Sequence, residues 1–106
     1  MVPFFAMDKR RPTYDVEAFK TAVVEGRADF TQSAVSGARA LGYGLADMKA
    51  AIGSMTRRQF YKSMTSLADH RIWQDVYHLH HEGQWIYVKF TADTVCEFTL
   101  LSFKEK

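Results

Sequence analysis

The chain has 106 residues, of which 47% are hydrophobic and 14% aromatic, enough for one domain with a single modest core. Fourteen Lys and Arg residues against twelve Asp and Glu residues give a formal net charge of +2, which permits an anionic partner without requiring one. This composition argues against a disordered chain, and no apolar run approaches the roughly 20 residues of a transmembrane helix.

Two further features bear on the setting of the protein. The single cysteine, Cys96, cannot form an internal disulfide, which suits a reducing cytoplasm. The apolar opening residues are followed rather than preceded by basic residues, the reverse of a secretory signal. We therefore expect one domain over residues 1–106, with residues 1–12 as a loose N-terminal extension.

Three helices are expected in the first half of the chain. Asp15 can cap a helix whose apolar residues recur at helical spacing as far as Gly26. Thr31 can cap a second helix that ends at Gly42, and a third begins near Leu45. Alanine-rich helices of this kind typically form a packing layer.

From residue 60 onward the residues become aromatic, β-branched and alternating, a pattern typical of strands. We predict four strands, at about 60–66, 72–80, 84–91 and 94–103. Turns at residues 82–84 and 91–93 would join the last three in an antiparallel meander. In the third strand Ile86, Val88 and Phe90 share one side, which should face the helices. The sequence thus predicts an α+β domain, with N-terminal helices packed on one face of a C-terminal antiparallel sheet.

The four histidines, at positions 70, 78, 80 and 81, are the candidate metal ligands. His78 and His80 would share one face of a strand, so a two-histidine site is geometrically possible. The sequence places no third ligand beside them, and exposed strand histidines are the simpler interpretation. Nucleophilic catalysis has equally weak support, because no Gly-x-Ser-x-Gly turn and no phosphate-binding glycine loop is present.

The helix-free face of the predicted sheet could present Lys62, Gln74, Tyr87 and Lys104 beside aromatic rings. RNA can be cleaved through its own 2′-hydroxyl without a metal, given a base, cations around the crowded phosphorane and an acid for the leaving 5′-oxygen. Aromatic faces can also stack on unpaired bases. The residues alone leave two interpretations open, an RNA-processing face or ordinary polar decoration of a sheet.

Four motifs in this half closely resemble the MqsR toxin family. They are Phe-Tyr-Lys-Ser-Met-Thr at 60–65, Asp-His-x-Ile-Trp-Gln-Asp-Val-Tyr at 69–77, Tyr-Val-Lys at 87–89 and Ser-Phe-Lys-Glu-Lys at 102–106. The likeness runs in order from about Thr13 to the last residue. It implies a RelE-like ribonuclease fold and a type II toxin, a cytoplasmic mRNA interferase that cuts single-stranded mRNA at short GC-containing, GCU-like sites and blocks translation.

The resemblance also implies a partner. Family toxins are neutralised by a cognate antitoxin of the MqsA type, which carries zinc in its own N-terminal domain and a helix-turn-helix at its other end. The toxin would therefore hold no metal or other cofactor, and it would meet DNA only indirectly through the antitoxin. The rival interpretation is a non-catalytic module that binds RNA or a protein.

Carried over by position, the resemblance places the catalytic residues at Lys62, Gln74, Tyr87 and Lys104. We expect Lys62 to be the proton acceptor or phosphate clamp, Tyr87 the proton-transfer partner, Lys104 the charge stabiliser and Gln74 an orienting group. A lysine base needs a pKa well below about 10.4, which neighbouring cations could bring about.

Two further residues in the matched motifs, Met64 and His70, rank below these four as candidates for substrate binding. The histidine-rich segment 78–81 is not part of the family pattern. Because loops beside an active site commonly set sequence selection, the target triplet is the least secure implication.

Overall fold

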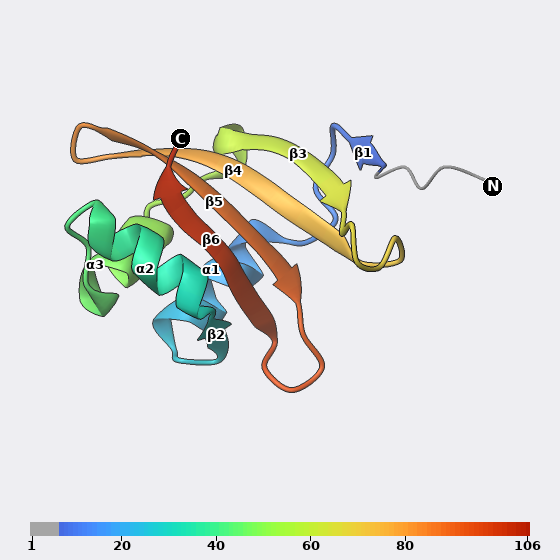
Figure 1. The fold of residues 1–106 in the computed structure, drawn as a ribbon, viewed down its shortest axis with the longest axis horizontal. Coiled ribbons are helices and arrows are strands. Elements are labelled where there is room, and N and C mark those ends of the chain that lie inside the picture. The colour runs from blue at the N-terminus through green and yellow to red at the C-terminus, as the bar shows by residue number, and fades with distance from the viewer. Residues whose placement is uncertain (1–6) are drawn as a thin grey trace.

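Three helices pack against a six-stranded, mostly antiparallel sheet in the computed structural model, which describes residues 7–106 (Figure 1). The helices are α1 (Val16–Val24), α2 (Gln32–Ala40) and α3 (Leu45–Gly53), followed by the 3-10 helix η1 (Arg57–Gln59). The strands are β1 (Asp8–Lys9), β2 (Ala28–Phe30), β3 (Phe60–Thr65), β4 (Trp73–His81), β5 (Gln84–Ala92) and β6 (Phe98–Glu105). Their order in the sheet is β1-β3-β4-β5-β6-β2, so the predicted α+β arrangement is confirmed.

The helices begin and end where their capping residues predict. The Asp15 carboxylate accepts the Glu17 N–H at 2.9 Å, and the Thr31 hydroxyl accepts the Ala34 N–H at 3.1 Å. Gly26 and Gly42 follow α1 and α2 with φ of 77° and 86°, a conformation that is costly for residues with a Cβ. None of the helices within residues 7–106 has the length and apolar character needed to cross a membrane.

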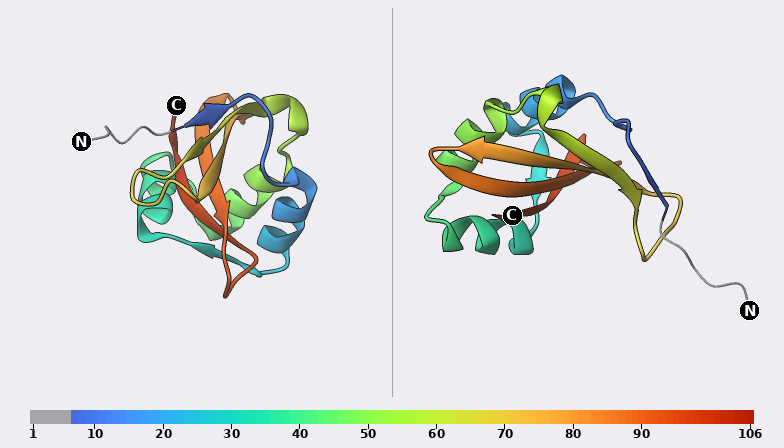
Figure 2. Two further views of the ribbon diagram at one scale, coloured as in Figure 1. Left: turned by 90° about the vertical axis from the view of Figure 1, so that its right-hand side faces the viewer. Right: turned by 90° about the horizontal axis from the view of Figure 1, so that it is seen from above.

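Strands β3 to β6 form the predicted antiparallel meander, whose strong twist is visible in Figure 2. The prediction missed two short strands, because two or three residues are too few to show an alternating pattern. One is β2, which runs parallel to β6 at the sheet edge. The other is β1, which pairs with β3 inside the segment expected to be loose. Residues 1–6 of that segment lie outside the described residues, whereas Met7 exchanges 2.8 Å hydrogen bonds with Thr65.

The start of the last strand was predicted wrongly. β6 begins at Phe98 rather than near residue 94, because residues 93–97 close a turn of their own. Within this turn the Asp93 N–H donates to the Glu97 carbonyl at 3.1 Å, and the Asp93 carboxylate accepts the Val95 N–H and the Thr99 hydroxyl. The predicted turn at 91–93 therefore begins too early, whereas the turn at 82–84 is confirmed by the positive φ of Glu82 and Gly83.

The core lies between the helices and one face of the meander. Phe19 of α1 stacks on Phe90 of β5 with ring centroids 3.7 Å apart, and Phe98 meets both rings edge-on. Ile86, Val88 and Phe90 are fully buried on this side, as the alternation predicted. The opposite side of the meander carries the polar residues of interest, and we call it the outer face.

Helix α2 lies against β6 at Gly37. A Cβ at this position would collide with the backbone carbonyl oxygen of Phe103 and would lie 3.2 Å from the Cβ of Lys104. Only glycine therefore allows the helix to approach the strand this closely. The contact positions β6, which carries one of the predicted site residues.

We expect Gly37→Ala to lower the free energy of unfolding by about 1–3 kcal/mol, because the added methyl group must push α2 away from β6. Gly53→Ala is the matched control, since a Cβ there would meet only Val24 at 4.0 Å and alanine favours helix. Urea unfolding of both variants measures the difference. Equal stability changes in the two variants would show that the α2–β6 contact does not need glycine.

Candidate active site

Strand pairing arranges the side chains of the outer face in rows that run across the sheet. The lysine row consists of Lys62 on β3, Val76 on β4, Lys89 on β5 and Ser102 on β6. The tyrosine row, one step nearer the β4–β5 hairpin, consists of His78, Tyr87 and Lys104. On the far side of the lysine row, Gln74 pairs with Met64. Neighbouring rows are about 7 Å apart, the length of two strand residues.

The four predicted catalytic residues therefore meet on the outer face, one from each strand of the meander. Lys62 comes from β3, Gln74 from β4, Tyr87 from β5 and Lys104 from β6, all within three adjacent rows. Tyr87 and Lys104 are direct cross-strand partners, and the Lys104 Nζ lies 5.2 Å from the centre of the Tyr87 ring. Lys62 and Lys104 are 42 positions apart in sequence and share one face because β4 and β5 join their strands into a single sheet.

Lys89 lies in the middle of this face and was not among the predicted site residues. It is flanked by Val76 and Ser102 in the lysine row and is half-buried. Burial, and then the positive charge of Lys104, lower the pKa of Lys89 below its usual value. The alternation that placed Tyr87 on the outer face places Lys89 there too. The sequence pattern could therefore have identified Lys89 as a site residue.

Tyr87 is held in its neutral form. Burial raises the pKa of the Tyr87 phenol, and the neighbouring Tyr61 raises it further. Because the ordinary tyrosine pKa is already about 10, the hydroxyl keeps its proton at neutral pH. Tyr87 is therefore suited to donate a proton or a hydrogen bond rather than to accept a proton.

Aromatic rings border the lysines on the β3 side. A register shift between Phe60 and Lys62 brings Tyr61 onto the outer face, where its ring stacks on His78 with centroids 4.2 Å apart. The Lys62 Nζ lies 5.5 Å from the centre of the same ring. The His78 ring lies 6.2 Å from Tyr87, so the rings form a continuous surface beside the basic side chains.

The two lower-ranked candidates differ in their position. Met64 lines a hollow of about 460 Å³ at the end of the site, together with Gln74, Lys89 and residues 65–68. His70 is exposed in the β3–β4 connection and is not among the residues that line this hollow. The structure therefore places Met64 beside the predicted catalytic residues, while His70 lies in the adjoining loop.

The histidine-rich segment is divided between the two faces of the sheet. His78 and His80 share the outer face, as predicted, whereas the inward-facing His81 has its Nδ1 2.7 Å from the hydroxyl of Tyr43. Within residues 7–106 no group of three His, Cys, Asp or Glu side chains is placed to hold a metal ion. The third ligand that a site on His78 and His80 would need is not supplied by the described residues.

The buried carboxylate of Asp75, on the helix side of the sheet, helps to position the neighbouring Gln74. Asp75 is fully buried on the helix side and accepts the backbone N–H groups of Thr13 and Tyr14 at 2.9–3.1 Å. The Tyr14 hydroxyl donates to the carbonyl of Trp73 at 2.9 Å. These bonds fix the start of β4 to the segment that precedes α1, so the backbone on both sides of Gln74 is held in place.

The fold and this face define a class, a small α+β domain whose helix-free sheet face displays lysine and aromatic side chains. Residues 11–105 match the family model described as motility quorum-sensing regulator, toxin of MqsA. The mRNA interferase toxin MqsR of Escherichia coli (strain K12) is 37% identical over 100 residues, covering 94% of this chain and 100% of that relative. The chain belongs to the MqsR toxin family, which confirms the resemblance seen in its motifs.

Proposed function

We propose that the protein is the toxin of a toxin–antitoxin pair and that it cleaves single-stranded mRNA without a metal ion. The observation that carries the proposal is the convergence of Lys62, Gln74, Tyr87 and Lys104, with Lys89 between them, on one face of the sheet. Membership of the MqsR family supports it, since the relative from Escherichia coli is an mRNA interferase.

RNA supplies the nucleophile for this reaction. A base removes the proton of a 2′-hydroxyl, and the resulting oxygen attacks the adjacent phosphorus. The bond from phosphorus to the 5′-oxygen of the next nucleotide breaks, and that oxygen takes up a proton. The products are a 2′,3′-cyclic phosphate and a 5′-hydroxyl end, so the protein has to supply only a base, an acid and positive charge.

The side chains of the site divide these tasks by their electrostatics. Lys89 is the best suited proton acceptor, because its pKa is lowered by burial and by Lys104. Lys62 then clamps the phosphate, Lys104 stabilises the developing negative charge and Gln74 orients the substrate. Tyr87, whose pKa is raised, protonates the leaving 5′-oxygen. Of the two roles expected of Lys62, proton acceptor or phosphate clamp, this assignment keeps the clamp and gives the proton acceptor to Lys89.

Membership of the MqsR family also supports a proposal for the substrate and the partner. We propose cleavage at short GC-containing sites, with GCU-like triplets preferred, in the cytoplasm where mRNA is translated. We further propose that an MqsA-type antitoxin blocks the toxin and that zinc and DNA binding belong to this partner. We place a nucleobase next to the cleaved bond in the hollow beside Met64 and Gln74.

The purified protein should cleave single-stranded RNA in the presence of EDTA and leave 5′-hydroxyl ends, which are detected by end-labelling with a polynucleotide kinase. Lys62→Ala and Tyr87→Phe should each lower the cleavage rate by about 100-fold or more, because they remove the phosphate clamp and the proton donor. Lys49→Ala on α3, away from the outer face, is the control. Intact RNA under these conditions would leave only a non-catalytic binding module.

A pair of lysine-to-arginine variants separates proton transfer from charge. Lys89→Arg should lose about 100-fold or more in single-turnover cleavage, because arginine keeps the charge but does not give up its proton. Lys104→Arg should retain most of the activity, because its role needs only the charge. If Lys89→Arg cleaves as fast as the wild type, Lys89 is not the base.

A further inference from the structure

We propose that the outer face carries a second RNA subsite, formed by His80, Trp85 and Lys106. It binds a nucleotide adjacent to the two nucleotides that the cleaved bond joins. The inference rests on the proposed function, because the ligand is the same RNA strand. It concerns the part of the histidine-rich segment that lies outside the family motifs, and it gives the exposed Trp85 a role.

The geometry repeats from one row to the next. In the tyrosine row β4 contributes His78, β5 contributes Tyr87 and β6 contributes Lys104. One step nearer the hairpin, His80 on β4 pairs with Trp85 on β5, and the Lys106 N–H donates to the Trp85 carbonyl at 3.1 Å. We call this second set the tryptophan row.

The contacts within the two rows are also alike. The Lys106 Nζ lies 5.5 Å from the centre of the Trp85 ring, and the Lys104 Nζ lies 5.2 Å from the Tyr87 ring. The His80 ring lies 4.7 Å from Trp85. Each row thus combines an aromatic ring with a cation at the β6 edge, which are the groups that bind a stacked base and its phosphate.

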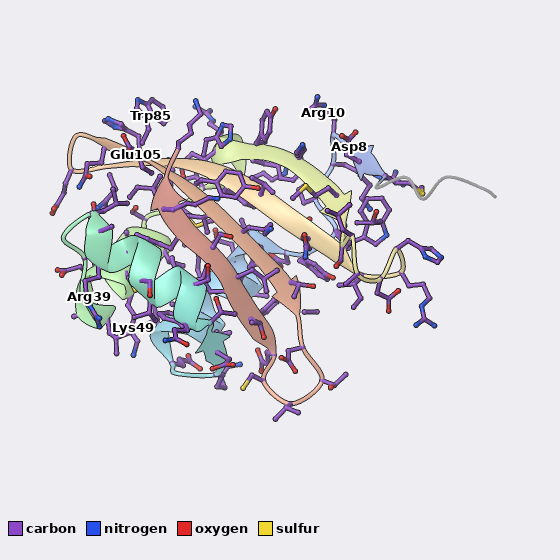
Figure 3. The ribbon with its side chains drawn as sticks, viewed as in Figure 1. Asp8, Arg10, Arg39, Lys49, Trp85 and Glu105 are labelled. Atoms are coloured by element: carbon purple, nitrogen blue, oxygen red, sulfur yellow. The ribbon has the colours of Figure 1, made fainter. Side chains whose placement is uncertain are left out.

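Trp85 is open to a ligand. Its side chain is 55% exposed, although burying a tryptophan ring away from water is energetically favourable. Figure 3 shows Trp85 extending from the hairpin end of the sheet, away from the side where Arg39 and Lys49 lie on α2 and α3. A hollow of about 320 Å³ lies beside the ring, lined by residues 83–85 and 105–106.

Charge and continuity favour RNA over a protein as the occupant. The tryptophan row follows the tyrosine row at a step of about 7 Å, so an RNA strand bound at the candidate active site continues onto the tryptophan row. Lys104 lies on β6 and Lys106 directly follows the end of that strand, so each can meet a phosphate. Glu105, which also lines the hollow, is the partner of the inward-facing Ile86, so its side chain starts on the helix side of the sheet.

Binding to RNAs of two lengths tests the subsite. Each RNA carries a 2′-O-methyl group at the cleaved position, and the longer RNA has two additional nucleotides at its 5′ or 3′ end. The wild type should bind one of the longer RNAs about 10-fold more tightly than the short RNA, the gain of one stacked base. In Trp85→Ala this ratio should fall to near 1, whereas Trp85→Phe should keep part of it.

The lysine is tested through the salt dependence of binding. Lys106→Gln should lower the slope of log affinity against log salt by about 1 for the longer RNA, because one phosphate contact is lost. Lys49→Gln makes the same charge change on α3 and should leave the slope as in the wild type.

Three outcomes would overturn the subsite. A wild-type length ratio in Trp85→Ala would show that the ring does not bind a base. If Trp85→Ala binds RNA as the wild type does but binds an MqsA-type antitoxin more weakly, the tryptophan row is a protein interface. If the wild type neither binds nor cleaves RNA, the proposed function fails together with the subsite, whereas loss of the length effect alone leaves that function standing.

Discussion

The register of the meander is the constraint on which the site depends. Val88 pairs with Tyr77 on one side and with Phe103 on the other, and all three are fully buried against the helices. A slip of one residue would turn these side chains outward and drive Tyr87 and Lys89 into the core. The stack of Phe19 on Phe90 opposes such a slip from the helix side. The apolar face thus specifies where the polar face points.

The separation of a buried apolar face from a polar outer face fits the chemistry that we propose. A ribonuclease that uses the 2′-hydroxyl of its substrate needs neither a nucleophile nor a deep cavity, only charges and a proton donor held at fixed spacing. Three lysines from three strands supply the charge, and burial together with the positive charge of Lys104 explains the lowered pKa of Lys89. The rigid strands keep these cations together, and Tyr87 beside them keeps its proton.

Local signals in the sequence predicted much of the fold, and long-range pairing accounts for what they missed. Asp15 and Thr31 cap their helices by contacts within three residues, so their pattern could be recognised. The alternation in β5 likewise identified its buried face. By contrast, the start of β6 depends on the bonds of the Asp93 carboxylate, and β1 and β2 form only because a neighbouring strand is in place. The residues alone placed the four motif residues on the helix-free face, and the family resemblance gave them their catalytic roles. The tryptophan row depends on the irregular β5–β6 register, which no local pattern reveals.

The proposed mechanism requires RNA to bind across the outer face of the meander. Chemical-shift mapping of the ¹⁵N-labelled protein with an RNA carrying a 2′-O-methyl group at the cleaved position tests it most directly. We expect the largest changes on the amides of β3 to β6 around Lys62, Gln74, Tyr87 and Lys104. Changes concentrated on α1, α2 and α3, with the strand amides unmoved, would contradict it.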